Sequence, residues 1–223
     1  MADRPGTAGQ TALPAVLVTV GLGVWVLRQA SARWGATSGE ARAALPGDDL
    51  VPVPDYAATN ATTVQAAPGE VWPWLVQMGA YTRAGWYSFD RFDNSGVPSA
   101  WEIVPELQHL QVGDVLPTDR DGTGFVVARL DPPHAMVLVI REQGTVTSSV
   151  FVLREHDRGT RLLCRLRLTA PRTTVGVRYR LLMELGHVPM TLSMLAGIRR
   201  RAESSRPGAC CHGPGSEHPA PGS

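Results

Sequence analysis

Aromatic rings lie beside carboxylates in residues 84–94, whose sequence is AGWYSFDRFDN. Aromatic residues make up only 6% of the chain, so four of them within seven positions form a local concentration. Tyr87 and Asp90 are one helical turn apart, and a hydroxyl near a carboxylate can orient a ligand or serve general acid–base catalysis. The rings of Trp86 and Tyr87 fit either the rim of a ligand pocket or the packing of a core. Asp90 fits either a structural hydrogen bond or a ligand or catalytic contact.

Further candidates for a binding site follow along the chain. Glu102 stands where the chain enters the predicted sheet, and it is either a solvated loop carboxylate or part of the site. Glu184 interrupts the apolar face of a predicted C-terminal helix, a face that should meet the sheet. Met190 and Met194 fit either the pliable wall of a cavity or ordinary core packing. His187, beside a predicted helix break, is typical of a structural histidine.

The motifs of common enzyme classes are absent from the sequence. It contains no Gly-x-Ser-x-Gly elbow, no phosphate-binding Gly loop and no His/Glu pair at metal-ligand spacing. Cys210, Cys211, His212 and His218 are metal-ligand types, but their spacing is not that of a zinc site. The net charge of +1 argues against a nucleic-acid partner. We therefore expect no metal, no cofactor and no nucleic acid, and the catalytic residues of any reaction are unknown.

Both ends of the chain differ in composition from its middle. Residues 12–27 (ALPAVLVTVGLGVWVL) are almost continuously apolar, so we predict that residues 11–30 form a hydrophobic helix and membrane anchor. Arg28 and Arg33 follow this run, which favours a cytoplasmic main domain. The alternatives are a cleaved signal peptide of an exported protein, with ASA at 30–32 as the cleavage site, and an arm of a soluble cytoplasmic protein. Residues 1–10 and the Pro/Gly/Ser-rich residues 205–223 are predicted to be disordered.

The middle of the chain shows both helical and strand periodicity. Residues 31–58 are rich in turn residues and are predicted to be an extended lead-in. We predict a strand over 59–66, a helix over 68–78 and a short helix within 86–94. Four strands separated by turn signals are predicted over 123–130, 135–142, 146–155 and 160–170. A long helix follows from residue 173, and Pro189 is expected to kink or divide it near Val188.

The two faces of the last predicted strand differ in polarity. In TRLLCRLRLT, one face carries Leu162, Cys164, Leu166 and Leu168, and the other carries Arg161, Arg165 and Arg167. This alternation predicts that the leucine face is buried and that the arginine row forms a solvated exterior of the sheet. Cys164 is expected to be a small core residue.

Ordered motifs along the chain resemble one known superfamily. LPGDDLVPVPDY, APGEVWPWLVQMG, AGWYSFDRFDN, SAWEIVPELQHLQVGD and LAGIRRRAE together look like the SRPBCC (START-like) superfamily, closest to its bacterial polyketide cyclase/dehydrase-like and lipid-transport-like branch. The resemblance implies an α+β helix-grip fold over residues 59–204. In this fold a curved antiparallel sheet grips a long C-terminal helix, and an apolar cavity lies between the sheet and the helix. Relatives bind lipids, sterols, polyketides or hormones there, and a minority are enzymes.

The resemblance and the residues together favour the binding or transport of an apolar small molecule, lipid or polyketide-like, in that cavity. The alternative is a polyketide cyclase/dehydrase-like enzyme that uses Tyr, Asp and Glu groups in the same cavity as acids and bases. Trp86 and Tyr87 match the aromatic pair of the branch's GGWYSYD-like motif. The candidate ligand-binding residues are Trp86, Tyr87, Asp90, Glu102, Glu184, Met190 and Met194.

Overall fold

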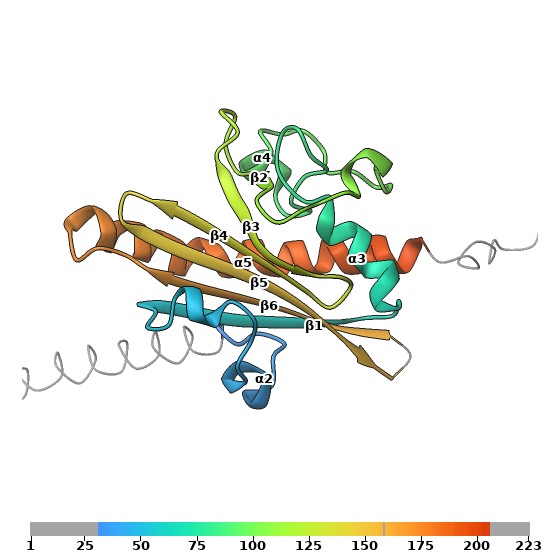
Figure 1. The fold of residues 1–223 in the computed structure, drawn as a ribbon, viewed down its shortest axis with the longest axis horizontal. Helices are drawn as coiled ribbons and strands as arrows, with labels where there is room; N and C mark the ends of the chain where they lie inside the picture. The colour runs from blue at the N-terminus through green and yellow to red at the C-terminus, as the bar shows by residue number, and fades with distance from the viewer. Residues whose placement is uncertain (1–30, 158, 206–223) are drawn as a thin grey trace, which may run out of the picture.

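A six-stranded antiparallel sheet forms the frame of the protein, with the strand order β1-β6-β5-β4-β3-β2 (Figure 1). The strands are β1 (Tyr56–Val64), β2 (Val115–Pro117), β3 (Gly124–Asp131), β4 (Ala135–Glu142), β5 (Thr145–His156) and β6 (Gly159–Thr169). The computed structural model describes residues 31–157 and 159–205. The predicted membrane anchor (11–30), the predicted disordered N-terminus (1–10) and residues 206–223 of the predicted tail lie outside the described residues.

The strands from β3 to β6 lie where the sequence predicts four strands separated by turn signals. The β4–β5 hairpin turns at Gln143 and Gly144, which both have positive φ (47° and 79°). A two-residue hairpin turn of this kind requires left-handed backbone, and Gly144 adopts it without steric cost. The three residues of β2 were not predicted, because so short a strand shows no period.

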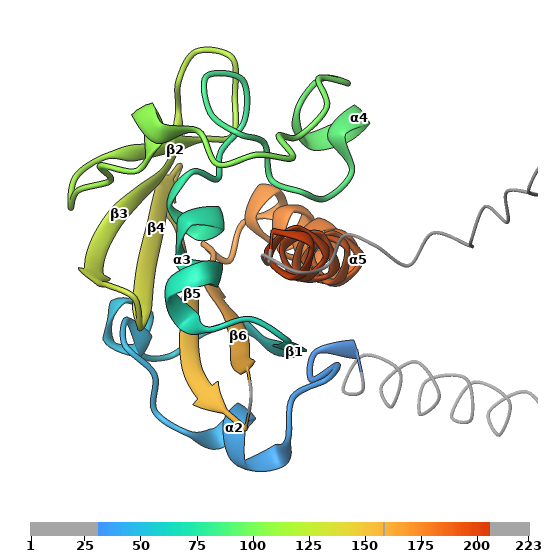
Figure 2. The same cartoon turned by 90° about the vertical axis from the view of Figure 1, so that its right-hand side faces the viewer.

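One long helix, α5 (Thr174–Ser204), lies across a face of the curved sheet (Figure 2). Thr173 caps its first turn, because its hydroxyl accepts a hydrogen bond from the Gly176 N–H at 3.2 Å. The helix continues through Pro189, so the expected division near Val188 is wrong. Proline leaves the Leu185 carbonyl without its helical donor, but the Leu185 side chain is 77% exposed and water can reach that turn.

Two short helices connect β1 to the rest of the sheet. The first, α3 (Pro68–Val76), begins with proline at its first turn, where the missing N–H costs nothing. The predicted helix within 86–94 is reduced to α4 (Asp90–Asp93). Tyr87 has a φ of 58°, and this left-handed conformation prevents a helix from starting at Trp86. The 3-10 turn η2 (Pro105–Leu107) then leads towards β2.

The main hydrophobic core lies between the sheet, α3 and the C-terminal half of α5. Its fully buried side chains include Trp74, Leu75, Met78, Phe151, Leu153, Leu162, Leu195 and Ile198. Full burial of each such side chain contributes about 1.5–3 kcal/mol. The N-terminal half of α5 differs, since Val175, Leu181 and Leu182 are exposed there. The core therefore fixes one half of α5 and leaves the other half less tightly packed.

The opposite face of the sheet is covered by residues 31–55, which we call the N-terminal strap. It contains α2 (Ser38–Arg42) and the 3-10 turn η1 (Asp48–Leu50). The prediction of a solvated arginine row is wrong, because Arg165 is only 3% exposed beneath the strap. Its guanidinium donates hydrogen bonds to Asp48 Oδ2 at 2.7 Å and to the carbonyls of Glu40 and Ala43 at 2.8 Å.

The two neighbouring arginines of β6 also bind the strap. Arg161 Nε donates to Glu40 Oε1 at 2.7 Å, and Arg167 Nε donates to the Val51 carbonyl at 2.8 Å. A buried guanidinium is costly unless it is paired and hydrogen-bonded, and the strap supplies both kinds of partner. The strand alternation separates the two faces correctly, but it does not show that a distant segment covers the polar one.

Among the described helices, α5 is long and apolar enough to cross a membrane, judged by length and composition. The core helix of a soluble domain meets the same criterion. Packing against the sheet accounts for the apolar residues in the C-terminal half of α5, whereas Leu181, Leu182 and Leu185 are exposed.

Candidate functional site

A cavity of about 460 Å³ lies between the sheet and the middle of α5, and we call it the grip cavity. Its apolar wall consists of Trp86, Phe92, Phe125, Phe151, Leu166, Leu182, Met183, Met190 and Met194. Its remaining lining residues are Ser88, Asp93, Thr118, Ser149, Cys164, Gly186, His187 and Thr191. The cavity is therefore largely apolar, with a few polar groups from several elements.

Small side chains on facing elements leave this space open. Ser149 on β5 and Cys164 on β6 point into it from the sheet, and Gly186 faces it from α5. A Cβ atom added at Gly186 would meet nothing within 4 Å. Burial raises the pKa of the Cys164 thiol to about 12, so the thiol is neutral and is not an activated nucleophile.

Besides Cys164, two ionisable residues line the grip cavity, Asp93 and His187. Burial, together with the charge of Asp90, raises the pKa of the Asp93 carboxyl, and hydrogen bonding from the Phe89 backbone and, to a smaller extent, from Ser88 opposes this rise. Neither Asp93 oxygen accepts a hydrogen bond of normal geometry from the part of the chain that the structure describes. Burial lowers the pKa of His187 to about 4, so its ring is neutral at pH 7, and it lies 3.2 Å from the Thr191 hydroxyl.

Tyr87, a predicted site residue, does not line the grip cavity. Its ring is 2% exposed, its hydroxyl donates to the Trp74 carbonyl at 3.1 Å, and it accepts from Gln77 Nε2 at 2.9 Å. Burial raises the pKa of the Tyr87 hydroxyl above its usual value. The hydroxyl is thus bound within the fold, and it is not presented to a ligand.

Asp90 is also directed into the fold. Its carboxylate accepts hydrogen bonds from the Ser99 N–H at 2.9 Å and from the Ser99 hydroxyl. The same hydroxyl oxygen accepts from the Tyr87 N–H at 3.1 Å. This arrangement ties the two ends of the loop 87–99 together, and it explains by structure alone why a carboxylate follows the aromatic pair.

Arg201 attaches this loop to α5. Its guanidinium lies 4.5 Å from the centre of the Tyr87 ring and 4.2 Å from that of the Trp101 ring, and its Nε donates to the Ala100 carbonyl at 2.7 Å. Cation–π contacts of this kind are worth about 0.5–2 kcal/mol each. The sequence gives no signal for these contacts, because the partners of Arg201 come from a loop about 100 residues earlier.

The remaining predicted site residues fall into two groups. Glu102 is exposed, and its backbone carbonyl, not its carboxylate, accepts a hydrogen bond from Gln77 Nε2 at 3.2 Å. Glu184 Oε1 lies 3.7 Å from Arg180 Nε on the same helix, and neither Glu102 nor Glu184 lines the grip cavity. Met190 and Met194 do line it, on successive turns of α5.

Trp86 lines the cavity from the loop side. Its indole N–H donates to the Pro117 carbonyl at 3.2 Å, and its ring meets Phe125 edge to face at 6.1 Å. Sequence reasoning missed Asp93 and His187 as cavity groups. Their residue types were visible in the sequence, but the direction of their side chains was not.

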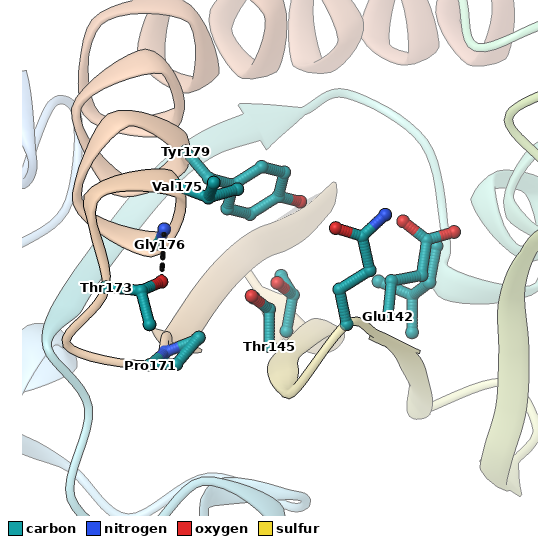
Figure 3. A pocket seen from close by; sticks show the side chains of 10 residues that line it. Glu142, Thr145, Pro171, Thr173, Val175, Gly176 and Tyr179 are labelled. Atoms are coloured by element: carbon teal, nitrogen blue, oxygen red, sulfur yellow. Dashed lines mark hydrogen bonds between the residues drawn. The ribbon is translucent and has the colours of Figure 1, made fainter.

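A second cavity of about 500 Å³ lies at the N-terminal end of α5, and we call it the terminal cavity. Figure 3 shows Tyr179 and Val175 on α5 facing Thr145 and Glu142 of the β4–β5 hairpin across it. Thr147 of the terminal cavity and Ser149 of the grip cavity are alternate residues on one face of β5. The two cavities therefore follow one another along the same groove between helix and sheet.

No group of three or more His, Cys, Asp or Glu side chains is placed to hold a metal ion within residues 31–157 and 159–205.

The antiparallel sheet with a long C-terminal helix across it defines the helix-grip fold, which is the fold of the SRPBCC (START-like) superfamily. The sequence matches no family model, and no curated protein matches it. Among solved structures, the chain is similar to protein Ms6760 from Mycobacterium smegmatis, with 14% identity over 67% of this chain and 92% of that chain and a TM-score of 0.40.

Two further solved structures show the same degree of likeness. The Polyketide_cyc-like protein Cgl2372 from Corynebacterium glutamicum has 14% identity over 65% of this chain and 89% of its own, with a TM-score of 0.37. The Aha1 dimer from Colwellia psychrerythraea has 14% identity over 66% of this chain and 96% of its own, with a TM-score of 0.39. These likenesses identify neither a ligand nor an activity, and the fold assignment rests on the topology of the chain itself.

Proposed function

We propose that the protein binds and carries an apolar small molecule, lipid or polyketide-like, in the grip cavity. The observation that carries this proposal is a volume of about 460 Å³ with a mainly aromatic, leucine and methionine wall. Protein interiors are normally packed with few voids larger than a water molecule. Ligand pockets typically measure about 300–1,000 Å³ and combine an apolar wall with a small number of polar groups.

The access to the cavity also suits an apolar ligand. Phe92 and Leu182 line it and yet are 81% and 67% exposed, so they stand where the cavity opens to solvent. Met190 is 38% exposed at the same wall. Exposed apolar side chains at an opening can shield a hydrocarbon from water while it enters or leaves.

The cyclase or dehydrase alternative receives less support from the arrangement of residues. Of the acid–base set considered from the sequence, Tyr87 and Asp90 are hydrogen-bonded within the fold, and Glu102 and Glu184 lie outside the cavity. Burial also holds His187 neutral with a pKa of about 4, which makes it a weak base near pH 7. Carriage therefore remains the proposed function.

The proposal is tested by titrating the full-length protein with N-phenyl-1-naphthylamine, a neutral apolar dye whose fluorescence rises when it leaves water. We expect saturable binding to the wild type. The variant Gly186→Leu places a side chain in space that is open at this position, and we expect it to weaken binding at least about tenfold, or about 1.4 kcal/mol.

Gly186→Ala is the matched control, because it makes the same change in backbone freedom with little added volume. Both variants gain up to about 1 kcal/mol of helix propensity, so both should remain folded. The dye should bind Gly186→Ala as it binds the wild type. Absence of saturable binding to the wild type, or equal binding by all three proteins, would contradict a carrier role for this cavity.

We further propose that residues 11–30 attach the protein to a membrane, with the main domain in the cytoplasm. The support is the length and apolar character of residues 12–27 and the arginines Arg28 and Arg33 after them. The exposed apolar opening of the grip cavity would then lie on a protein held close to a lipid surface.

A further inference from the structure

Several polar groups of the grip cavity are bound within the protein or buried. The Trp86 indole N–H donates to the Pro117 carbonyl. The Ser88 hydroxyl donates to the Met190 carbonyl at 3.0 Å. Both carboxylate oxygens of Asp93 are buried, so a ligand does not reach them. The grip cavity therefore suits the apolar part of a ligand, and a polar group of that ligand needs partners elsewhere.

The terminal cavity, which comes next along the groove, has a more polar lining. A carboxylate, a carboxamide and several hydroxyls line it, among them those of Glu142, Gln143, Thr145, Thr173 and Tyr179. No arginine or histidine lines it within the part of the chain that the structure describes, and the chain contains no lysine. The terminal cavity therefore suits the polar end of a ligand, and the charge of its lining is negative.

Glu142 carries that negative charge. Its side chain is exposed, and no hydrogen bond or ion pair joins its carboxylate to another of the described residues. Tyr179 faces it across the cavity (Figure 3). Burial raises the pKa of the Tyr179 hydroxyl, the nearby Thr147 hydroxyl opposes this rise, and the charge of Glu142 adds to it. Glu142 thus presents an unpaired carboxylate that a ligand can reach.

The spacing along β5 and α5 sets the length of a ligand that reaches both cavities. Thr145, which pairs with Glu142 in the sheet, is four residues from Ser149 of the grip cavity, or about 13 Å along the strand. On α5, Tyr179 lines the terminal cavity and Met183, one turn further on, lines the grip cavity. A molecule that occupies both cavities is therefore elongated, with its polar group at one end.

We propose that the terminal cavity is a second subsite, which binds the ammonium group of a long-chain amine whose apolar chain occupies the grip cavity. This inference rests on the proposed carrier function and specifies its ligand class. An ammonium group has three donors and a positive charge, so it pairs with Glu142 and donates to a neighbouring hydroxyl such as that of Thr145. A carboxylate at the same place would face Glu142 without a cation between them.

The test measures displacement of N-phenyl-1-naphthylamine from the full-length protein by dodecylamine and by dodecan-1-ol, at pH 7 and low ionic strength. An alkyl amine is protonated at this pH, as a lysine side chain is. We expect the amine to displace the dye at a concentration about fivefold lower than the alcohol, as for an ion pair near the surface. Hexylamine and hexan-1-ol are too short to extend from Glu142 into the grip cavity, so these two should differ by less than about twofold.

Glu142→Gln removes the charge and keeps the size of the side chain, so the preference for dodecylamine should fall to within about twofold. Because Glu142 is exposed, the variant should fold, which is checked by its dye binding. Glu155→Gln is the matched control, since Glu155 is an exposed carboxylate near the end of β5 that lines neither cavity, and it should keep the full preference.

Three results would overturn the second subsite and leave the carrier function standing. These are equal displacement by dodecylamine and dodecan-1-ol in the wild type, an unchanged preference in Glu142→Gln, and the same preference for the six-carbon amine as for the twelve-carbon one. Absence of dye binding to the wild type would overturn both proposals.

Discussion

At the scale of single residues, His187 couples the cavity wall to the stability of the protein. Burial lowers its pKa from 6.5 to about 4, so between these pH values the unfolded chain binds more protons than the folded one. Stability is therefore lost as the pH falls through this window, by up to about 3 kcal/mol. We expect urea unfolding at pH 7, 5.5 and 4.5 to show this loss in the wild type and a flatter profile in His187→Asn.

The comparison is between slopes, because the asparagine also changes packing at every pH. His109→Asn, which alters an exposed histidine, should leave the slope unchanged. Glu40 does not contribute to the slope between pH 7 and 4.5. Hydrogen bonds from Arg161 lower the pKa of Glu40 to about 2, so its stabilising contribution is lost only as the pH falls below about 4.5. The same slope in His187→Asn as in the wild type would contradict this account.

The choice between Asp90 and Asp93 shows where sequence reasoning about the site reaches its limit. Both carboxylates lie in the motif that drew attention, and helical periodicity assigns each to a face. The left-handed Tyr87 prevents that helix from forming before Asp90, and in the short helix that remains Asp90 accepts hydrogen bonds from Ser99, whereas Asp93 lies in the cavity wall with both carboxylate oxygens buried. A positive φ at a tyrosine has no sequence signal, because asparagine and glycine are the residues that favour it.

At the scale of elements, strong local periodicity made most of the sheet and the long helix predictable. Turn signals separated the strands from β3 to β6, and alternation distinguished the two faces of β6. The N-terminal strap was not predictable in the same way, since its short helical turns carry no period and its role is set by contact with distant arginines. Arg165 finds its acidic partner Asp48 about 117 positions away, and only the folded chain brings them together.

The crossing of α5 and the Tyr87 loop depends on Gly197. A Cβ at this position would collide with the Tyr87 carbonyl oxygen and Cβ, and a backbone atom cannot move aside cheaply. We expect Gly197→Ala to lower the free energy of unfolding by about 2–3 kcal/mol, although alanine is the better helix former. Gly186→Ala, on the same helix in open space, should instead raise it by up to about 1 kcal/mol. Urea unfolding measures the free energy of unfolding of both variants. Equal stability of the two would show that the crossing of α5 and the Tyr87 loop is not close-packed.

At the scale of the whole molecule, several apolar features lie on one side. In Figure 2, α4, the outer face of α5 and the start of the described chain all lie on the side away from β3 and β4. Phe92 on α4 and Leu182 and Leu185 on α5 are exposed apolar side chains. The residue from which the predicted membrane segment continues thus lies on the same side of the protein as α4 and α5, the helices that carry Phe92 and Leu182 of the cavity wall.

This geometry makes the membrane proposal testable apart from ligand binding. We expect the full chain to sediment with membranes and to resist carbonate extraction, because about 20 apolar residues suffice to span a bilayer. A variant that lacks residues 1–30 should be released into the soluble fraction and should bind N-phenyl-1-naphthylamine as the full chain does, since none of the cavity-lining residues is removed. The intact mass of the membrane-bound protein should include residues 1–30. A mass that begins near residue 33 would indicate a cleaved signal peptide instead, and a full chain found in the soluble fraction would contradict the anchor.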